Sequence, residues 1–309
     1  MTDHNFNDEV AADKNQTIDY RPAEPKGPEG FGPADLPPVL GHYVVGQELK
    51  HGGMGRIVRV WDEQFKRPLA LKLVRERNAR LEQRLVYEGR LTGCLQHPSI
   101  PPVHDQGRLP DGRPYFIMKL IQGGSLSDLL RRRASPTEEL PRFLLIFEQL
   151  CAAAGYAHSQ GVIHRDLKPG NVMVGAFGEV QLIDWGLAKL MPGAMAALEP
   201  VADEPGTMYG LKQTTVVAGL ETTAGAALGT PAYMAPEQAR GELESPDARA
   251  DVFGLGAILC EVLTGSPAYR GRDVHAVADQ ARRADLTDAW ERLANCGAAA
   301  GGAAATAVG

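Results

Sequence analysis

Residues 162–174, VIHRDLKPGNVMV, constrain the fold more than any other stretch of this chain. Two apolar segments of the kind that form buried strands enclose a centre of charged and amide side chains. Burying such groups is costly unless each finds a hydrogen-bond or ionic partner. The partners must therefore come from elsewhere in the fold or from a ligand. The side chains concerned are His164, Arg165, Asp166, Lys168 and Asn171.

Composition and charge exclude several classes of protein. The 309 residues suffice for about two typical domains or one two-lobed unit. A net charge of -6 argues against a nucleic-acid-binding domain with a basic face, and we interpret the basic run at 131–133 as a solvated helix end. The four cysteines form no CxxC pair, which favours reduced thiols in a cytoplasmic protein. No leader or long apolar run is recognisable, so we expect no membrane segment.

The order of local patterns indicates a small sheet-rich lobe followed by a larger helical one. Residues 43–74 contain three strand-like segments, separated by the turns HGGMG and EQFKRP. Two more strands are expected around IPPVHDQGRL and RPYFIMKLI. The expected helices lie at 80–95, from Ser125, at 141–160, at 251–264 and, for a short helix, after Asp285.

Both ends of the chain have compositions typical of flexible segments. Residues 1–40 are rich in Asp, Asn, Pro and Gly, which predicts a disordered tail. Residues 297–309 are mostly Ala and Gly, which predicts a flexible low-complexity tail. Between them we expect the small lobe at 41–121 and the large lobe at 122–296.

Three features of the small lobe suit phosphate binding. Gly52, Gly53 and Gly55 in the turn HGGMG would let the backbone approach a phosphate closely, although such a turn is more often a simple hairpin. Lys72 ends the strand-like segment LALK. Glu88 lies on the apolar stripe of the following helix, where a carboxylate needs a cation. We expect Lys72 and Glu88 to pair; the alternative is two unrelated rim charges.

Two segments of the large lobe suit phosphoryl transfer. In HRDLKPGN, the carboxylate of Asp166 can face a hydroxyl, and Lys168 can neutralise a phosphate. The amide of Asn171 can bind a hard metal ion. In IDWG, Asp184 follows an apolar strand and is a second candidate ligand for Mg²⁺.

Taken together, these motifs resemble the catalytic domain of eukaryotic-type protein kinases, of the serine/threonine class found in bacteria. The family signature comprises a glycine-rich loop, a strand lysine, a helix glutamate, HRDLxxxN, DFG and APE. This chain has HGGMG, Lys72, Glu88, HRDLKPGN, DWG and APE in that order, over about residues 43–290. The resemblance implies a two-lobed α+β fold, with a small antiparallel sheet and one helix preceding a mainly helical lobe. It also implies that 184–237 is the activation segment.

The resemblance implies a role for each matching side chain. Lys72 would contact the α- and β-phosphates of ATP and pair with Glu88. Asp166 would orient the substrate hydroxyl, and Lys168 would stabilise the γ-phosphoryl charge.

Asn171 and Asp184 would hold Mg²⁺. The residues implied around the nucleotide, besides Lys72 and the three glycines of the turn, are Ile57, Ala70, Met118 and Met173, with 119–121 as the hinge.

The segment GTPAYMAPE at 229–237 and Lys168 resemble serine/threonine rather than tyrosine kinases. The implied reaction is transfer of the γ-phosphoryl group of ATP to serine or threonine hydroxyls of a protein substrate. Thr230 would brace Asp166 and Lys168, and Asp251 would accept hydrogen bonds from the backbone of HRDLKPGN.

Arg165 implies a cationic pocket for a phosphate on the activation segment. We therefore expect autophosphorylation within 207–223, with a homodimer needed if it occurs in trans. The candidate acceptors are Thr214, Thr215, Thr222 and Thr223.

Three departures from the family pattern keep a second interpretation open. Lys50 stands where the glycine-rich loop usually opens with glycine, and Trp185 replaces phenylalanine in DFG. The family's large lobe usually continues through further helices, so we expect a lobe that lacks its last helices, with Glu237 unpaired and part of the 251–264 helix uncovered. The second interpretation is a truncated or weakly active kinase-fold module that binds nucleotide or acts as a scaffold. A small-molecule kinase is a third, which GTPAYMAPE disfavours.

Overall fold

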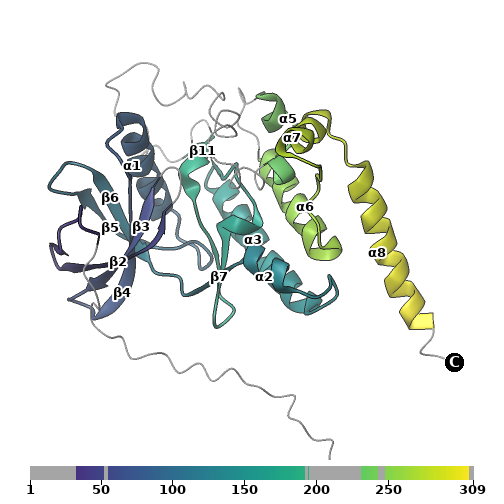
Figure 1. Ribbon diagram of the computed structural model, residues 1–309, viewed down its shortest axis with the longest axis horizontal. Helices are drawn as coiled ribbons and strands as arrows, with labels where there is room; N and C mark the ends of the chain where they lie inside the picture. The colour runs from purple at the N-terminus through teal and green to yellow at the C-terminus, as the bar shows by residue number, and fades with distance from the viewer. Residues whose placement is uncertain (1–32, 52–54, 192–193, 195–230, 243–247, 306–309) are drawn as a thin grey trace, which may run out of the picture.

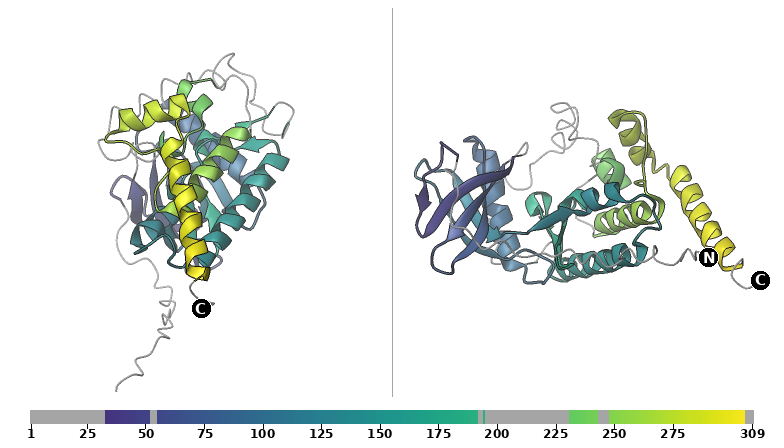
Figure 2. Two further views of the ribbon diagram at one scale, coloured as in Figure 1. Left: turned by 90° about the vertical axis from the view of Figure 1, so that its right-hand side faces the viewer. Right: turned by 60° about the horizontal axis from the view of Figure 1, so that its bottom comes forward.

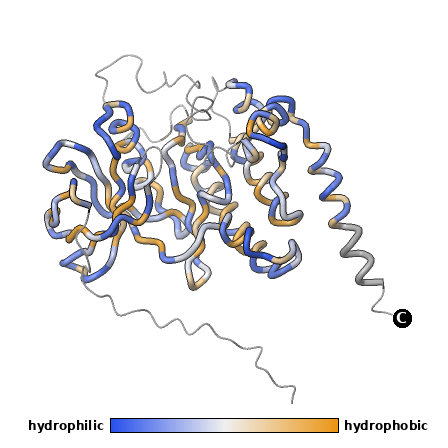
Figure 3. The backbone as a smooth tube through the Cα atoms, viewed as in Figure 1, coloured by the Kyte–Doolittle hydropathy of each residue, from blue (hydrophilic) through white to orange (hydrophobic). Residues whose placement is uncertain are grey.

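A sheet-rich lobe and a helical lobe follow each other along the chain (Figure 1). The computed structural model describes residues 33–51, 55–191, 194, 231–242 and 248–305. Hydrophilic turns surround the small lobe, and hydrophobic segments run through the middle of the molecule (Figure 3). The two-lobed α+β fold expected from the sequence is confirmed.

The small lobe is built on a six-stranded antiparallel sheet with the strand order β1-β2-β3-β4-β6-β5. Its strands are β1 Val39–Leu40, β2 Tyr43–His51, β3 Arg56–Asp62, β4 Arg67–Leu73, β5 Val103–Arg108 and β6 Pro114–Lys119. Side chains alternate between the faces of β4. Leu69, Leu71 and Leu73 join the buried cluster of this lobe, so Ala70 and Lys72 point the other way.

Helix α1, Ala79–Cys94, packs against β6. It begins at Asn78, whose side chain accepts hydrogen bonds from the amides of Arg80 and Leu81. Gly89 permits a close approach, because a Cβ there would lie only 2.9 Å from the Phe116 ring. The neighbouring Glu88 is thereby brought down to the sheet.

Residues 33–40 correct the predicted tail, because they belong to the small lobe. Val39–Leu40 pairs with β2, and Leu36 joins the buried cluster of the sheet. Asp35 forms ion pairs with Arg56 and Arg113. The sequence pattern missed this segment because one buried leucine and one paired carboxylate hold it, and neither forms a periodic signal. Residues 1–32 lie outside the described part of the chain.

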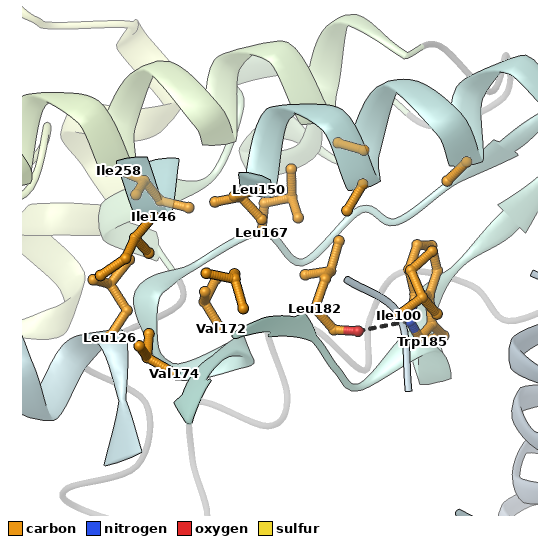
Figure 4. Close-up of a cluster of buried hydrophobic side chains, with 14 of the residues drawn as sticks. Ile100, Leu126, Ile146, Leu150, Leu167, Val172, Val174, Leu182, Trp185 and Ile258 are labelled. Carbon is orange, nitrogen blue, oxygen red and sulfur yellow. Dashed lines mark hydrogen bonds between the residues drawn. The ribbon is translucent and has the colours of Figure 1, made fainter. Parts of the chain in front are cut away.

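The large lobe is mainly helical. Its helices are α2 Leu126–Arg132, α3 Leu140–Ser159, α5 Pro236–Arg240, α6 Arg249–Thr264, α7 Val274–Arg283 and α8 Thr287–Ala305. Short strands complete it: β7 Gly123–Ser125, β8 Val162–Ile163, β9 Val172–Gly175, β10 Val180–Leu182 and β11 Lys189–Leu190. The strands pair as β7-β9-β10 and as β8-β11. Its core joins Leu150 of α3, Ile258 of α6 and the short strands (Figure 4).

The end of the large lobe differs from the prediction. Helix α8 was expected to be short, but it continues to Ala305, into the predicted flexible tail. Alanine has the highest helix propensity, and the composition argument overlooked this. Figure 2 shows α8 at the end of the large lobe that is farthest from the sheet. Part of α6 is uncovered as expected, with Val252 59% exposed. No helix among the described residues is long and apolar enough to cross a membrane.

The basic run at the end of α2 is only partly solvated. Arg131 and Arg132 are exposed, as expected, but Arg133 turns inward and corrects that interpretation. Its guanidinium donates to the carbonyls of Glu261 and Val262 and lies 4.4 Å from the centre of the Phe143 ring. It thereby caps the C-terminal end of α6 and fastens α2 to the core helices.

We predict that Arg133→Met lowers the free energy of unfolding by about 2–3 kcal/mol, because the carbonyls at the end of α6 lose charged donors and Phe143 loses its cation. Urea denaturation followed by tryptophan fluorescence measures this. Arg132→Met is the matched control and should change stability by no more than about 0.5 kcal/mol. Equal effects of the two substitutions would contradict the capping role.

Candidate active site

Lys72 joins three elements at the junction of the lobes. Its ammonium lies 2.5 Å from Glu88 Oε1 of α1 and 3.2 Å from Asp184 Oδ1, in the segment after β10. The alternation of β4 directs Lys72 away from the lobe's apolar core, and the close packing of α1 places Glu88 beside it. Glu88 is buried, whereas the Asp184 side chain is 49% exposed. The expected pairing of Lys72 with Glu88 is confirmed.

The pKa values of the two carboxylates that contact Lys72 shift in opposite directions. The Lys72 ammonium lowers the pKa of Asp184 to about 2. Burial raises the pKa of Glu88 despite the nearby lysine. Burial disfavours the Lys72 ammonium, but the two carboxylates outweigh it and raise its pKa. Asp184 is therefore an exposed carboxylate that stays ionised at neutral pH and can bind a cation.

Asp166, Lys168 and Asn171 meet in the loop between β8 and β9 of the large lobe. The Lys168 ammonium lies 2.6 Å from Asp166 Oδ2. The Asn171 amide nitrogen donates to the backbone oxygen of Asp166 at 2.8 Å and to its Oδ2 at 3.0 Å. A short 3₁₀ turn, Pro169–Asn171, folds the asparagine back onto the aspartate. Because the Asn171 nitrogen is engaged here, its amide oxygen is left as the group for a metal ion.

Asp251, at the start of α6, anchors the backbone of this loop. It is 1% exposed and accepts hydrogen bonds at 2.7 Å from the amides of both His164 and Arg165. His158 of α3 approaches the same carboxylate at 2.8 Å. Arg165 has φ of 67°, a left-handed conformation that costs a non-glycine residue about 1–2 kcal/mol. Asp251 compensates this cost, and the hydrogen bonds expected from the family resemblance are confirmed.

The DWG segment is held from both lobes. Trp185 is 1% exposed, packs edge-on against His164 and donates from Nε1 to the Leu182 carbonyl at 3.1 Å (Figure 4). Arg84 of α1 donates to the Gly186 carbonyl at 3.1 Å. Sequence reasoning missed Arg84, although it lies one helical turn before Glu88 and so on the same face of α1. It also missed His158, for which the sequence offers no comparable signal.

The residues predicted to surround adenine lie on both lobes. Ile57 is in register with Lys72, and Ala70 is in register with Met118. Cross-strand partners share a face of a sheet, so these four side chains lie on one face. Met173 lies on β9 of the large lobe, in register with Ser125 and Gln181.

Gly55 lies where a Cβ would be 2.9 Å from the Leu73 carbonyl, which explains the need for glycine. The remaining predicted glycines and threonines lie outside the described residues: Gly52, Gly53, Thr214, Thr215, Thr222, Thr223 and Thr230.

Two of the departures from the family pattern, Lys50 and Glu237, lie at residues that the structure describes. Lys50 is an exposed residue of β2. Within the described ranges, no cation forms an ion pair with Glu237, which is partly exposed rather than buried. The cost of a buried unpaired carboxylate therefore does not apply in full to Glu237.

Two cations, Arg165 of the HRDLKPGN loop and Lys189 of β11, lie close together. Lys189 of β11 is in register with Ile163 of β8, close to Arg165. Burial lowers the pKa of Arg165, and burial together with Arg165 lowers the pKa of Lys189. Such a cluster of positive charge favours a nearby anion.

Comparison with known proteins agrees with this geometry. The protein kinase domain model matches residues 43–300. Serine/threonine-protein kinase PknD of Chlamydia muridarum is 37% identical over 236 residues, which are 72% of this chain and 24% of that protein. PknD of Protochlamydia amoebophila is 30% identical over 270 residues, 83% of this chain and 26% of that protein. PknB of Mycobacterium tuberculosis is 33% identical over 249 residues, 79% of this chain and 36% of that protein. The chain thus spans about a quarter to a third of these relatives' length.

We predict that Asp251→Asn lowers the free energy of unfolding by about 2–4 kcal/mol at neutral pH, because an amide cannot accept all three hydrogen bonds. Asp279→Asn, which removes an exposed carboxylate paired with Arg282, is the matched control and should have little effect.

The Asp251 effect should also depend on pH. Burial raises the pKa of Asp251, but His158, His164 and the backbone amides outweigh it and hold the pKa below its usual value. The stabilisation is then complete above the unfolded-state pKa of about 3.9 and is lost as the pH falls through the folded-state pKa. Urea titrations from pH 7 to pH 3 should show the difference between wild type and variant shrinking in acid. A constant difference would contradict this account.

Proposed function

This chain belongs to the protein kinase domain family, and on that premise we propose that it is a serine/threonine protein kinase. The proposed reaction transfers the γ-phosphoryl group of ATP to a serine or threonine hydroxyl of a protein substrate. One observation carries the proposal: Asp184 connects two groups of charged side chains, because the charges of both Lys72 and Lys168 lower its pKa. Lys72 is held by Glu88 and Asp184, and Lys168 pairs with Asp166, to which Asn171 also donates. These are the charges and hydrogen-bonding groups that phosphoryl transfer needs.

The donor set fits Mg²⁺. Asp184 offers an ionised, half-exposed carboxylate and Asn171 an amide oxygen, and both are hard oxygen ligands. Among the described residues no group of three or more His, Cys, Asp or Glu could enclose a metal ion. That suits Mg²⁺, which is usually held by one or two protein ligands together with substrate phosphates. When bound, Mg²⁺ neutralises phosphate charge and orients the γ-phosphoryl group.

The chain's own residues supply the other steps. Glu88 holds the Lys72 ammonium where it can bind the α- and β-phosphates of ATP. Asp166 orients the acceptor hydroxyl and receives its proton. Lys168, 2.6 Å from the Asp166 carboxylate, neutralises charge that develops on the transferred group. Gly52, Gly53 and Gly55 would contact the phosphates, and Ile57, Ala70, Met118 and Met173 would enclose the adenine ring.

We further propose a cytoplasmic location, where ATP and reducing conditions prevail. All four cysteines, Cys94, Cys151, Cys260 and Cys296, are free, which supports a reducing compartment.

We predict that Asp166→Asn slows phosphoryl transfer at least about a hundredfold, because the acceptor hydroxyl loses its base. Nucleotide affinity should stay within about twofold of wild type, since Asp166 acts on the acceptor rather than on adenine or Lys72. The assay uses γ-labelled ATP, Mg²⁺ and myelin basic protein as the acceptor. Asp279→Asn serves as the control and should retain activity.

The same assay tests the alternative of a weakly active nucleotide-binding or scaffold module. Lys50 at the glycine-rich turn and the unpaired Glu237, judged within the described ranges, favour that alternative. If wild type and Asp166→Asn bound nucleotide but showed the same background transfer, the alternative would replace the kinase proposal.

We also propose that the Arg165–Lys189 cluster receives a phosphate on the activation segment. We predict phosphorylation within 207–223 when the protein is incubated with Mg²⁺ and ATP, detectable by mass spectrometry. Arg165→Gln should lower activity severalfold, since the phosphate loses charge-assisted hydrogen bonds. An active protein with that window unmodified would contradict the proposal.

The order of this reaction in protein concentration identifies its mode. A rate per molecule that rises with concentration supports phosphorylation in trans within a homodimer. A rate per molecule that does not change would mean that each chain modifies itself, or that the reaction takes place within a dimer already formed at the lowest concentration used.

A further inference from the structure

A network of ion pairs joins residues 33–40 to the base of the glycine-rich turn. Arg56, the first residue of β3, donates from Nη1 to both Asp35 carboxylate oxygens at 2.9 and 2.8 Å. Its Nε donates to Glu48 Oε2 of β2 at 2.9 Å. One guanidinium therefore spans the two strands that carry the turn and also holds the segment that precedes them.

The other end of the network is fixed to the opposite edge of the sheet. Arg113, whose side chain is 6% exposed, donates to Asp35 Oδ2 at 3.1 Å and to the Asp35 carbonyl at 3.2 Å. The Arg113 guanidinium also donates to Asp111 Oδ2 at 2.6 Å and to the Arg75 carbonyl at 3.3 Å. Arg113 thus provides a buried, multiply bonded anchor in the turn between β5 and β6.

Asp35 is the link between the two arginines. Asp35 forms ion pairs with both guanidiniums, that of Arg56 and that of Arg113. Glu48 pairs with Arg56, and Asp111 pairs with Arg113. The hydrogen bond from Arg56, with that from Arg113, holds the pKa of Asp35 below its usual value although burial opposes this, so the link is ionised at neutral pH. Leu36 in the core and β1 on β2 hold the segment on either side of the network.

The base of the turn is where small displacements affect a nucleotide. Arg56 is flanked by Gly55, which packs against the Leu73 carbonyl, and by Ile57, which is in register with Lys72. A shift of Arg56 would move both neighbours relative to the lysine. β2 is irregular here, with register shifts between Val45 and Glu48 and between Glu48 and Lys50. The ladder alone therefore fixes this end of the sheet less firmly than a regular hairpin would.

We infer that Asp35 is a positioning residue for residues 55–57 at the base of the glycine-rich turn, and that residues 33–40 thereby set the affinity of the nucleotide site. The protein kinase domain match begins at residue 43, so this element lies outside the region that the chain shares with the family model. The inference rests on the proposed function only in that it takes a nucleotide as the ligand of the site. A segment that restrains the base of the turn before binding reduces the conformational entropy that is lost when phosphates bind.

The experiment compares the full chain with Asp35→Ala, Asp35→Glu and the control Glu63→Ala. Glu63 forms an exposed ion pair with Lys66 in the same lobe, away from the turn. The dissociation constant for a fluorescent ATP analogue with Mg²⁺ should rise about three- to tenfold in Asp35→Ala, with the control within about twofold of wild type. Hydrogen exchange should be faster at the ends of β2 and β3. Asp35→Glu, which keeps the carboxylate, should recover at least part of the affinity.

Activity measurements separate positioning from stability. The KM for ATP should rise with the dissociation constant while kcat stays within about twofold, because the reacting groups are untouched. If Asp35→Ala does not fold, Arg56→Lys tests the same link, since an ammonium cannot bridge Asp35 and Glu48 as the fork does. An unchanged dissociation constant in these variants, even with a lower melting temperature, would overturn the inference.

The outcomes also separate this inference from the proposed function. If Asp35→Ala weakened nucleotide binding but the wild type transferred no phosphate, the kinase proposal would be wrong and the positioning role of Asp35 would be supported. If the wild type transferred phosphate but Asp35→Ala bound nucleotide normally, the kinase proposal would be supported and the positioning role would be wrong. A wild type that binds no nucleotide would overturn both.

Discussion

The Lys72 ammonium fixes one arrangement of three parts of the chain, and the rest of the site is built around it. It meets Glu88 of α1 and Asp184 of the large lobe, so its position requires the sheet, the helix and the DWG segment to be docked together. A buried ion pair adds little net stability, but removing one partner costs about 3–5 kcal/mol. The contact therefore contributes little to stability and mainly fixes how the sheet, helix α1 and the DWG segment are arranged. If α1 were to move away from β6, the ion pair between Glu88 and Lys72 would break.

Close packing and hydrogen bonds, several of them from charged side chains, hold the elements around that contact in place. Gly89 lets α1 approach Phe116, and Arg84 ties the helix to the Gly186 carbonyl. Asp251 holds the backbone of the HRDLKPGN loop from α6, the helix that Arg133 caps at its other end. Helix α6 therefore links the loop's position to the core of the large lobe. Lys72, Lys168 and Asp184 can stay partly exposed because buried groups, not the ligand, determine where they lie.

Local motifs and single-element periodicity were readable from the sequence, whereas contacts between distant segments were not. The stripe on α1 was enough to place Glu88 inward, and LALK was enough to place Lys72 on a strand. Nothing periodic marks Asp35, Arg133 or His158, because each is defined by a partner far away in the chain. Helix α5 was missed because its five residues are too few for a periodic pattern. Helix α7 was overlooked although Asp273 caps its start and its buried residues Val277, Ala278 and Ala281 lie at helical spacing.

Some polar groups at the centre of residues 162–174 are paired within the protein, and others are left accessible to a ligand. His164 and Asn171 bond to neighbouring backbone, and Asp251 satisfies the amides of His164 and Arg165, so these groups are paired within the protein. Asp166 and Lys168 pair with each other, yet Lys168 stays partly exposed, and Asp184 opposite them is half exposed. The internally paired groups make the loop rigid. The exposed ones remain able to exchange a protein partner for a phosphate or a metal ion.

Trp185 belongs to the internally paired groups, because its buried indole nitrogen donates to the Leu182 carbonyl and needs no partner from a ligand. Replacing phenylalanine there thus adds a hydrogen bond on the buried side and leaves the exposed side unchanged.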